Sequence, residues 1–132
     1  MKITLDTNFL VSATQWDYSV AHKLLLKLIE TNVQIFTTKD ILQEFSEVLE
    51  RDFKYAADEA ANIVEKVMSF VVLIETTSKV NAVHDDPDDN TILECALDSG
   101  SQYILTYDHH LLKLKEYKNI QIIKPEVARA IF

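Results

Sequence analysis

The stretch 84–90, with the sequence HDDPDDN, places four aspartates around one proline. Such carboxylates can cap a helix, because an aspartate at the helix start accepts backbone hydrogen bonds and negative charge is favoured there. They can also bind a divalent cation through their oxygens. Taken alone, the stretch favours the cap, with Asp86 as N-cap and Pro87 at the first helical position. Asp88 and Asp89 then lie in the first turn, where the helix dipole favours an anionic Asp89.

Three further acids fall where a shared site is expected. Asp6 comes directly after the strand-like residues 2–5, and Asp108 comes just beyond the strand-like residues 103–106. In mostly parallel sheets, ligands bind outside the carboxyl ends of the strands. Glu44 follows Ile41 by three residues on a predicted helix, so its carboxylate flanks the apolar stripe rather than opposing it. Each acid also has a purely structural interpretation, as a turn residue or a solvated helix residue.

Converging acids would need a cation. Two carboxylates about 4 Å apart repel each other by roughly 4 kcal/mol at an effective dielectric constant near 20. A folded protein relieves this repulsion by protonating one acid or by binding a cation. Carboxylate oxygens with room for water suit Mg²⁺ or Mn²⁺, whereas zinc prefers His and Cys ligands that the sequence does not cluster. The pattern therefore points to a site for Mg²⁺ or Mn²⁺.

The elements that must position these acids alternate between strands and helices. Strands are predicted at 2–5, 33–36, near 70–75, at 101–108 and at 120–124. Helices are predicted at 19–31, 38–51 with Thr38 as N-cap, 55–68, from about 87 onward and around 111. This alternation predicts an α/β fold with a mostly parallel sheet.

Composition limits the class of protein. The chain has 132 residues, of which 48% are hydrophobic, and this fits one domain with a real core. The formal net charge of −8 argues against a broad nucleic-acid-binding surface, although it allows a small acidic pocket. No signal peptide and no membrane-spanning run is recognisable, and the single Cys95 cannot form an internal disulfide. A cytoplasmic protein without a membrane partner is expected.

Four short motifs, in this order, resemble the PIN-domain family: LDTNFLVSA at the N-terminus, EF within the predicted second helix, DPDDNTILECAL, and ILTYDHHLL. The resemblance extends from residue 2 to about residue 125, and it is closest to small prokaryotic members such as VapC-like toxins of type II toxin–antitoxin systems. It implies a single PIN-like domain over residues 1–132. The implied fold is a Rossmann-like three-layer α/β/α arrangement with a central, mostly parallel sheet.

The resemblance also implies an activity, that of an Mg²⁺- or Mn²⁺-dependent endoribonuclease that hydrolyses RNA phosphodiester bonds. Asp6, Glu44, Asp89 and Asp108 match the four acids of the family. One or two metal ions would be held mainly by Asp6, Asp89 and Asp108. Glu44 would bind a metal or position a water molecule.

Supporting roles are implied for four polar residues. Asn8 and Thr106 match the positions that orient the first and last acids. Asp86 and Asn90 are expected to orient the metal-binding residues without binding the metal themselves. The expected partners are an RNA substrate and an antitoxin protein. The apolar stripe at 24–29 is expected in the core, with a homodimer contact as the alternative.

Other residues have two interpretations each. Cys95 is expected to be a buried thiol rather than a nucleophile, and His109 and His110 are expected at the surface or at a helix start. Trp16 either stacks on a nucleotide or packs against the following helix.

Two alternative functions remain open, and a third is disfavoured by the residue at position 8. A haloacid-dehalogenase-like phosphatase would need a second aspartate two residues after Asp6, where Asn8 stands. A non-catalytic protein-binding module of the same fold would be compatible with the acidic net charge. A PIN nuclease of RNA processing, rather than a toxin, would carry the same four acids.

Overall fold

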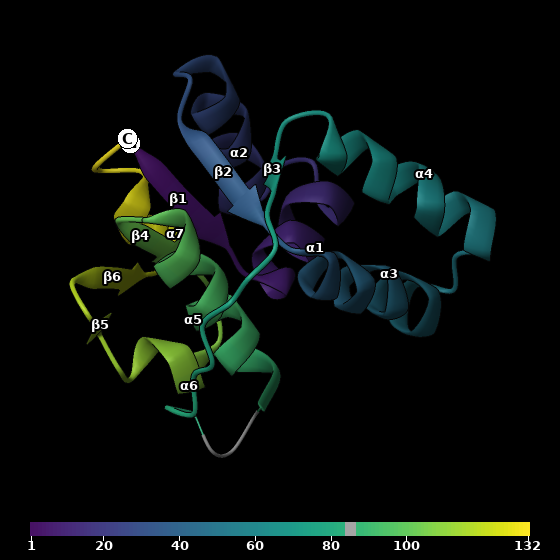
Figure 1. Ribbon diagram of the computed structural model, residues 1–132. Coiled ribbons are helices and arrows are strands. Elements are labelled where there is room, and N and C mark those ends of the chain that lie inside the picture. The colour runs from purple at the N-terminus through teal and green to yellow at the C-terminus, as the bar shows by residue number, and fades with distance from the viewer. Residues whose placement is uncertain (84–86) are drawn as a thin grey trace.

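A computed structural model of the chain describes residues 1–83 and 87–132 (Figure 1). Its strands are β1 (Lys2–Leu5), β2 (Gln34–Thr37), β3 (Val72–Leu73), β4 (Tyr103–Leu105), β5 (Glu116–Tyr117) and β6 (Ile120–Ile123). Its helices are α1 (Thr7–Gln15), α2 (Val20–Glu30), α3 (Lys39–Phe53), α4 (Ala57–Met68), α5 (Pro87–Ser99), α6 (His109–Leu112) and α7 (Pro125–Ala128). The expected N-cap Asp86 lies outside the described residues.

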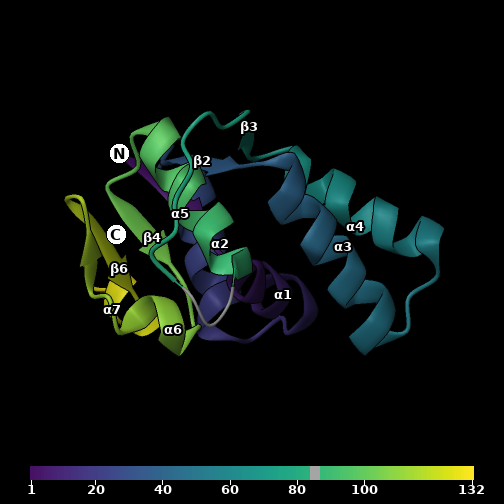
Figure 2. The same ribbon diagram turned by 60° about the horizontal axis from the view of Figure 1, so that its bottom comes forward.

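The strands form one sheet in the order β3-β2-β1-β4-β6-β5. β1 pairs in parallel with β2 and β4, the outer pairs β2–β3 and β4–β6 are also parallel, and β5 runs antiparallel to β6. Helix α5 packs against β1, β2 and β4 on one face, while α2 lies on the other face with α7 against it (Figures 1 and 2). The predicted three-layer α/β/α fold with a mostly parallel sheet is confirmed.

The central strands are almost entirely buried because helices cover both faces of the sheet. Ile3, Leu5, Ile104 and Leu105 are each 1% exposed or less. The apolar stripe of α2 belongs mainly to the core as well, since Leu24, Leu25 and Leu28 are buried while Leu26 and Ile29 are exposed. Among the described residues, no helix is long and apolar enough to cross a membrane.

Helix α3 forms as its sequence predicts. Thr38 is the N-cap, and its Oγ1 accepts a hydrogen bond of 3.3 Å from the backbone N–H of Ile41. Ile41, Leu42, Phe45 and Leu49 are buried along one side, as expected from their helical spacing. Glu44 is half-buried beside this stripe, so its carboxylate lies at the shoulder of the helix rather than in open solvent.

Three short elements were not predicted, and one strand is shorter than predicted. Helix α1 was not predicted, nor were the short elements β5 and α7. The strand expected to close at Asp108 ends at Leu105. Thr106 N still donates to Ile123 O of β6, but the backbone N–H groups of the next two residues bond to side chains instead of a neighbouring strand. Tyr107 N donates to Asn8 Oδ1 over 3.1 Å, and Asp108 N donates to Thr106 Oγ1 over 2.9 Å. This early end of β4 frees the chain to form a site.

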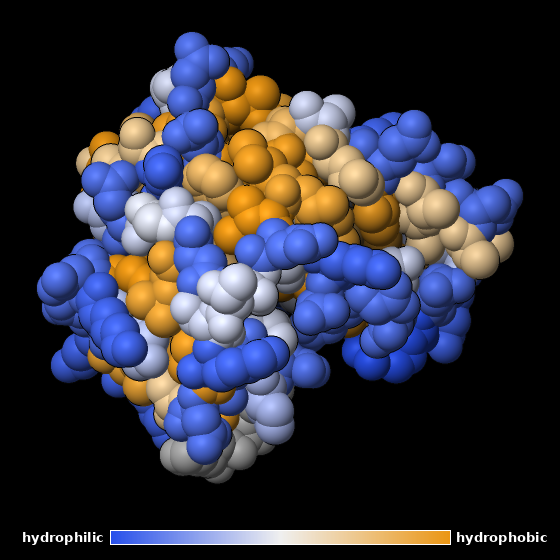
Figure 3. Space-filling model, viewed as in Figure 1, coloured by the Kyte–Doolittle hydropathy of each residue, from blue (hydrophilic) through white to orange (hydrophobic). Residues whose placement is uncertain are grey.

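Apolar side chains stay exposed at the β3 edge of the sheet. Met68, Val72 and Leu73 are between 42% and 50% exposed, and Figure 3 shows apolar atoms gathered over this region. An apolar strand at a sheet edge favours association with another chain. If the protein associates with itself or with a partner, this edge is a better surface than the buried stripe of α2.

Candidate active site

A pocket of about 500 Å³ opens at the carboxyl ends of β1 and β4, between helices α1, α3 and α5. All four acids predicted from the sequence line it: Asp6, Glu44, Asp89 and Asp108. They come from four separate segments, namely the end of β1, the middle of α3, the first turn of α5 and the residue before α6. The fold therefore brings together carboxylates that lie up to 102 positions apart in the sequence.

Asp6 is held from two sides. Its Oδ1 accepts a hydrogen bond of 2.7 Å from Thr7 N, which makes Asp6 the N-cap of α1. Its Oδ2 accepts a hydrogen bond of 2.6 Å from the hydroxyl of Thr106. Asp6 is 4% exposed and Thr106 is 0% exposed. Both contacts fix the orientation of the Asp6 carboxylate at this buried position.

Asn8 and Thr7 connect α1 to the other walls of the pocket. Asn8 Oδ1 accepts a hydrogen bond from Tyr107 N, so Asn8 fixes the backbone that carries Asp108. Thr7 Oγ1 donates a hydrogen bond of 3.3 Å to Glu44 Oε2. The first turn of α1 thus orients groups on both sides of Asp6.

Burial separates the two neighbouring aspartates of α5. Asp88 is exposed, whereas Asp89 is 4% exposed and lines the pocket. The next residue, Asn90, points elsewhere: its Oδ1 accepts hydrogen bonds from Ala82 N and Val83 N, and its Nδ2 donates to Val83 O. Asn90 therefore fastens the incoming chain to α5, so its support for the site acts through the position of the helix.

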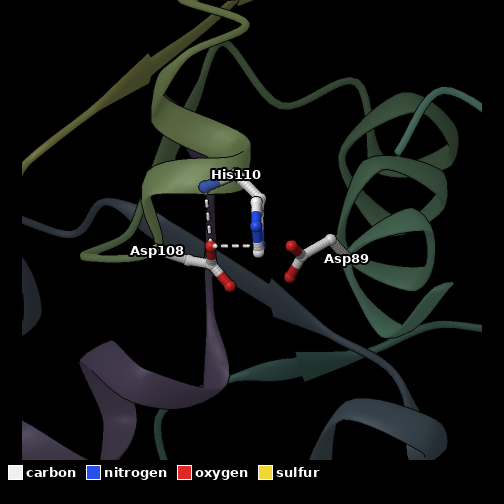
Figure 4. Close-up of side chains that lie close together, drawn as sticks. All are labelled: Asp89, Asp108 and His110. Atoms are coloured by element: carbon white, nitrogen blue, oxygen red, sulfur yellow. Dashed lines mark hydrogen bonds and ion pairs between the residues drawn. The ribbon is translucent and has the colours of Figure 1, made fainter. Parts of the chain in front are cut away.

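His110 lies at the start of α6, one of the two positions expected for it, and there it also joins the site. Among the described residues, ligand atoms of Asp89, Asp108 and His110 all lie within 4.8 Å of one another (Figure 4). His110 Nδ1 is 3.6 Å from Asp108 Oδ1, and the same oxygen accepts a hydrogen bond of 2.8 Å from His110 N. Asp108 is the N-cap of α6, and this cap places residue 110 above the carboxylate. The capping pattern D-x-H was the signal that could have identified His110.

This set of donors fits a divalent cation. Two carboxylates and an imidazole nitrogen can supply three ligand atoms within 4.8 Å of one another, and Asp6 and Glu44 line the same pocket as the two aspartates. Mg²⁺ prefers oxygen ligands, whereas the imidazole nitrogen suits transition metals. The composition of the group therefore favours Mn²⁺ or a similar transition-metal ion over Mg²⁺.

Burial raises the pKa values of two side chains, one that lines the pocket and one in the core. Burial raises the pKa of the Tyr107 hydroxyl to about 12, and the negative charge of Glu126 adds to the effect, so this hydroxyl stays protonated at neutral pH. Burial also raises the pKa of the Cys95 thiol to about 11, despite a contact with the Thr4 hydroxyl. Cys95 is buried where α5 packs on β1, as expected for a structural thiol, and it is not among the described residues that line the pocket.

Comparisons with known proteins come to a consistent result on the fold. A model of the PIN domain matches residues 2–110. One similar solved structure is that of VapBC2 from Rickettsia felis bound to a DNA fragment from its promoter. A chain of it is 14% identical with a TM-score of 0.68, over 94% of this chain and 98% of that chain. Another is Mycobacterium tuberculosis VapC20, described as a sarcin–ricin loop cleaving toxin, with 14% identity and a TM-score of 0.60 over 90% of this chain and 98% of that chain. None of the curated proteins compared with the chain matches it.

Proposed function

This chain belongs to the PIN-domain family, and from that premise we propose that it is a metal-dependent endoribonuclease that hydrolyses RNA phosphodiester bonds. The observation that carries the proposal is the convergence of Asp6, Glu44, Asp89 and Asp108 on one pocket at the carboxyl edge of the sheet. Carboxylates gathered from four segments repel one another unless a cation or a proton relieves the repulsion, and such clusters in a cleft mark candidate functional sites.

In this proposal, Asp89, Asp108 and His110 hold one divalent cation, and Asp6 and Glu44 complete the site or hold a second. When bound, Mg²⁺ or Mn²⁺ supplies a Lewis acid that polarises a phosphate and favours ionisation of water. Thr106 and Thr7 keep the carboxylates of Asp6 and Glu44 in place through their hydroxyls. Hydrolysis forms a new bond from water oxygen to phosphorus as the bond to the leaving ribose oxygen breaks.

Charge explains why a cation is needed before RNA binds. The chain has a formal net charge of −8, and no Lys or Arg is among the described residues that line the pocket. A phosphate entering this pocket without a cation would meet only like charge. We therefore expect RNA binding at this pocket to depend on the metal.

We further propose that the protein is the toxin of a toxin–antitoxin pair, acting in the cytoplasm with an antitoxin as its partner. Its fold is shared with VapC20 and with a chain of VapBC2, which supports this biological role. A PIN nuclease of RNA processing is the alternative with the same chemistry.

A single domain over 1–132 is part of the proposal, since β6 extends the sheet beyond the family match that ends at residue 110. A homodimer through the exposed β3 edge is compatible with it.

The test is cleavage of an RNA panel, including tRNA and ribosomal RNA stem-loops, with Mg²⁺, Mn²⁺ or EDTA. Asp89→Asn should abolish metal-dependent cleavage, whereas Asp88→Asn, which changes the exposed neighbour in the same helical turn, should keep it. Mn²⁺ should also raise the melting temperature of the Asp88→Asn protein but not of the Asp89→Asn protein. Equal cleavage by both variants would identify a contaminating nuclease. No cleavage with any metal, together with no thermal shift, would favour the non-catalytic binding module.

A further inference from the structure

The pocket continues past the acids toward an aromatic end. On α3, Glu44, Val48 and Asp52 follow one another at intervals of four residues, so they share one face of the helix. On α1, Val11 and Ser12 continue the opposite wall, which ends at Trp16. Eight residues of helix span roughly 12 Å at 1.5 Å per residue. The pocket is therefore longer than a metal ion and one phosphate require.

Trp16 is positioned at the far end by several contacts. It is the C-cap of α1: its N–H donates to Ser12 O, and its carbonyl accepts a hydrogen bond of 3.1 Å from Ser19 N. Its ring meets the Phe53 ring edge-on, with centroids 5.6 Å apart. Even so, Trp16 is 53% exposed, and both rings line the pocket.

A second link fixes the same corner of the molecule. The Tyr55 hydroxyl donates a hydrogen bond of 2.7 Å to Gln15 Oε1, which ties the end of α1 to the segment after α3. The backbone at Trp16 is thus held by its own helix and by the following turn, and the preceding residue is tied to the segment after α3. Aromatic groups held in this way lose little conformational entropy when they bind a ligand.

We propose that the end of the pocket formed by Val11, Trp16, Val48 and Phe53 is a subsite for an unpaired nucleobase of the RNA strand whose phosphate lies at the acids. This inference rests on the proposed nuclease function. A nucleotide carries a charged phosphate and a flat neutral base, and the pocket offers an acidic metal-binding end and an aromatic end in the same order. A base inside a duplex is stacked and paired, so only a single-stranded or extruded base reaches such a subsite.

Charge favours a base over other occupants of this end. Asp52 lines the pocket there and pairs with Arg51, whose Nε lies 2.9 Å from Asp52 Oδ1. The Arg51 side chain is 68% exposed and is not among the described residues that line the pocket. The charged side chains among those lining residues are therefore all acidic. A second phosphate or an acidic peptide would be repelled there, whereas a neutral base would not. Stacking on an aromatic ring is also tolerant of base identity.

The direct test uses the fluorescence of Trp16, which is the only tryptophan in the chain. Nucleoside 5′-monophosphates should quench this fluorescence saturably in Mg²⁺, and ribose 5-phosphate, which lacks the base, should not. Equal quenching by ribose 5-phosphate would overturn the subsite.

Variants give a second test by calorimetric titration with a single-stranded oligoribonucleotide in Mg²⁺. Trp16→Ala should weaken binding by about 5- to 150-fold, the range that corresponds to one base stacked on an aromatic side chain. Trp16→Phe should recover most of the affinity, because it keeps an aromatic face. Tyr18→Ala is the matched control, since Tyr18 is 89% exposed and is not among the described lining residues.

The outcomes separate this inference from the function on which it rests. The Mn²⁺-induced rise in melting temperature should persist in Trp16→Ala. If it persists and RNA affinity is also unchanged, the subsite is wrong while the metal site stands. If wild type shows no rise and no cleavage, the nuclease proposal fails first. If Trp16→Ala keeps RNA affinity but loses binding of an antitoxin, this end of the pocket receives an apolar side chain of a protein partner, and the base subsite is overturned.

Discussion

Thr106 donates its hydroxyl hydrogen to Asp6 Oδ2 over 2.6 Å, although the two residues are 100 positions apart. The contact follows from the parallel register of β1 and β4, in which Leu5 is the partner of Leu105. The same Thr106 oxygen accepts a hydrogen bond of 2.9 Å from Asp108 N. One buried hydroxyl therefore fixes the geometry of two of the four acids.

Replacing Thr106 with valine tests this coupling. Thr106→Val keeps the shape of the side chain but removes a donor to Asp6 and an acceptor for Asp108 N. We expect the free energy of unfolding to fall by about 1–3 kcal/mol, and the midpoint of Mn²⁺ binding to move to higher concentration. Urea unfolding and Mn²⁺ titration measure the two effects. Thr106→Ser, which keeps the hydroxyl, is the control, and equal behaviour of the two variants would show that the hydroxyl has no such role.

The place of His110 beside Asp89 and Asp108 leads to a prediction about metal preference. An imidazole nitrogen contributes more to binding of transition metals than of Mg²⁺. His110→Ala should therefore weaken Co²⁺ or Mn²⁺ binding by about tenfold or more, with a smaller effect on Mg²⁺. Calorimetric titration with each ion measures the difference. His109→Ala removes the exposed neighbouring ring, whose centroid lies 4.4 Å from that of His110, and should change both affinities much less than His110→Ala does, because His109 is not in the ligand group. A uniform loss for all ions in His110→Ala would show that His110 acts on the carboxylates rather than as a ligand.

The raised pKa of Cys95 predicts a change of stability with pH. Burial raises the pKa of this thiol from 9.0 to about 11. Because the folded value lies above the unfolded one, the contribution of Cys95 to stability is complete below about pH 9 and is lost as the pH rises through about 11. It amounts to no more than about 3 kcal/mol.

Two measurements check this prediction. The free energy of unfolding should fall less steeply between pH 9 and 11 in Cys95→Ala than in the wild type. In the folded wild type at pH 8, the thiol should resist an aromatic disulfide reagent, and it should react at once in urea. Rapid reaction of the folded protein would contradict the buried position.

Local patterns in the sequence were sufficient for much of the framework. Helical spacing and the capping residue Thr38 predicted α3, and this prediction is confirmed. The strand β1 and the start of α5 near Pro87 were also predicted from short-range signals. These features depend on residues only a few positions apart, so their physics is contained in the local sequence.

Helix α1 could not be predicted from local signals in the sequence. Its sequence, TNFLVSATQ, contains β-branched and polar residues with modest helix propensity. It is helical because Asp6 caps it and because Phe9, Leu10 and Ala13 are buried against the rest of the protein. Tertiary packing overrides propensity in this case. The sequence placed no helix here, although this helix forms one wall of the pocket.

The sequence by itself indicated the family and the α/β class and predicted four acids that prove to line one pocket, because each is encoded in a short motif or a regular spacing. Only the tertiary structure decided which side chains share the pocket with them. It brought His110 to Asp89 and placed Trp16 against Phe53. The physical reason is that these contacts join elements far apart in the chain, and the packing of helices against the sheet sets their distances.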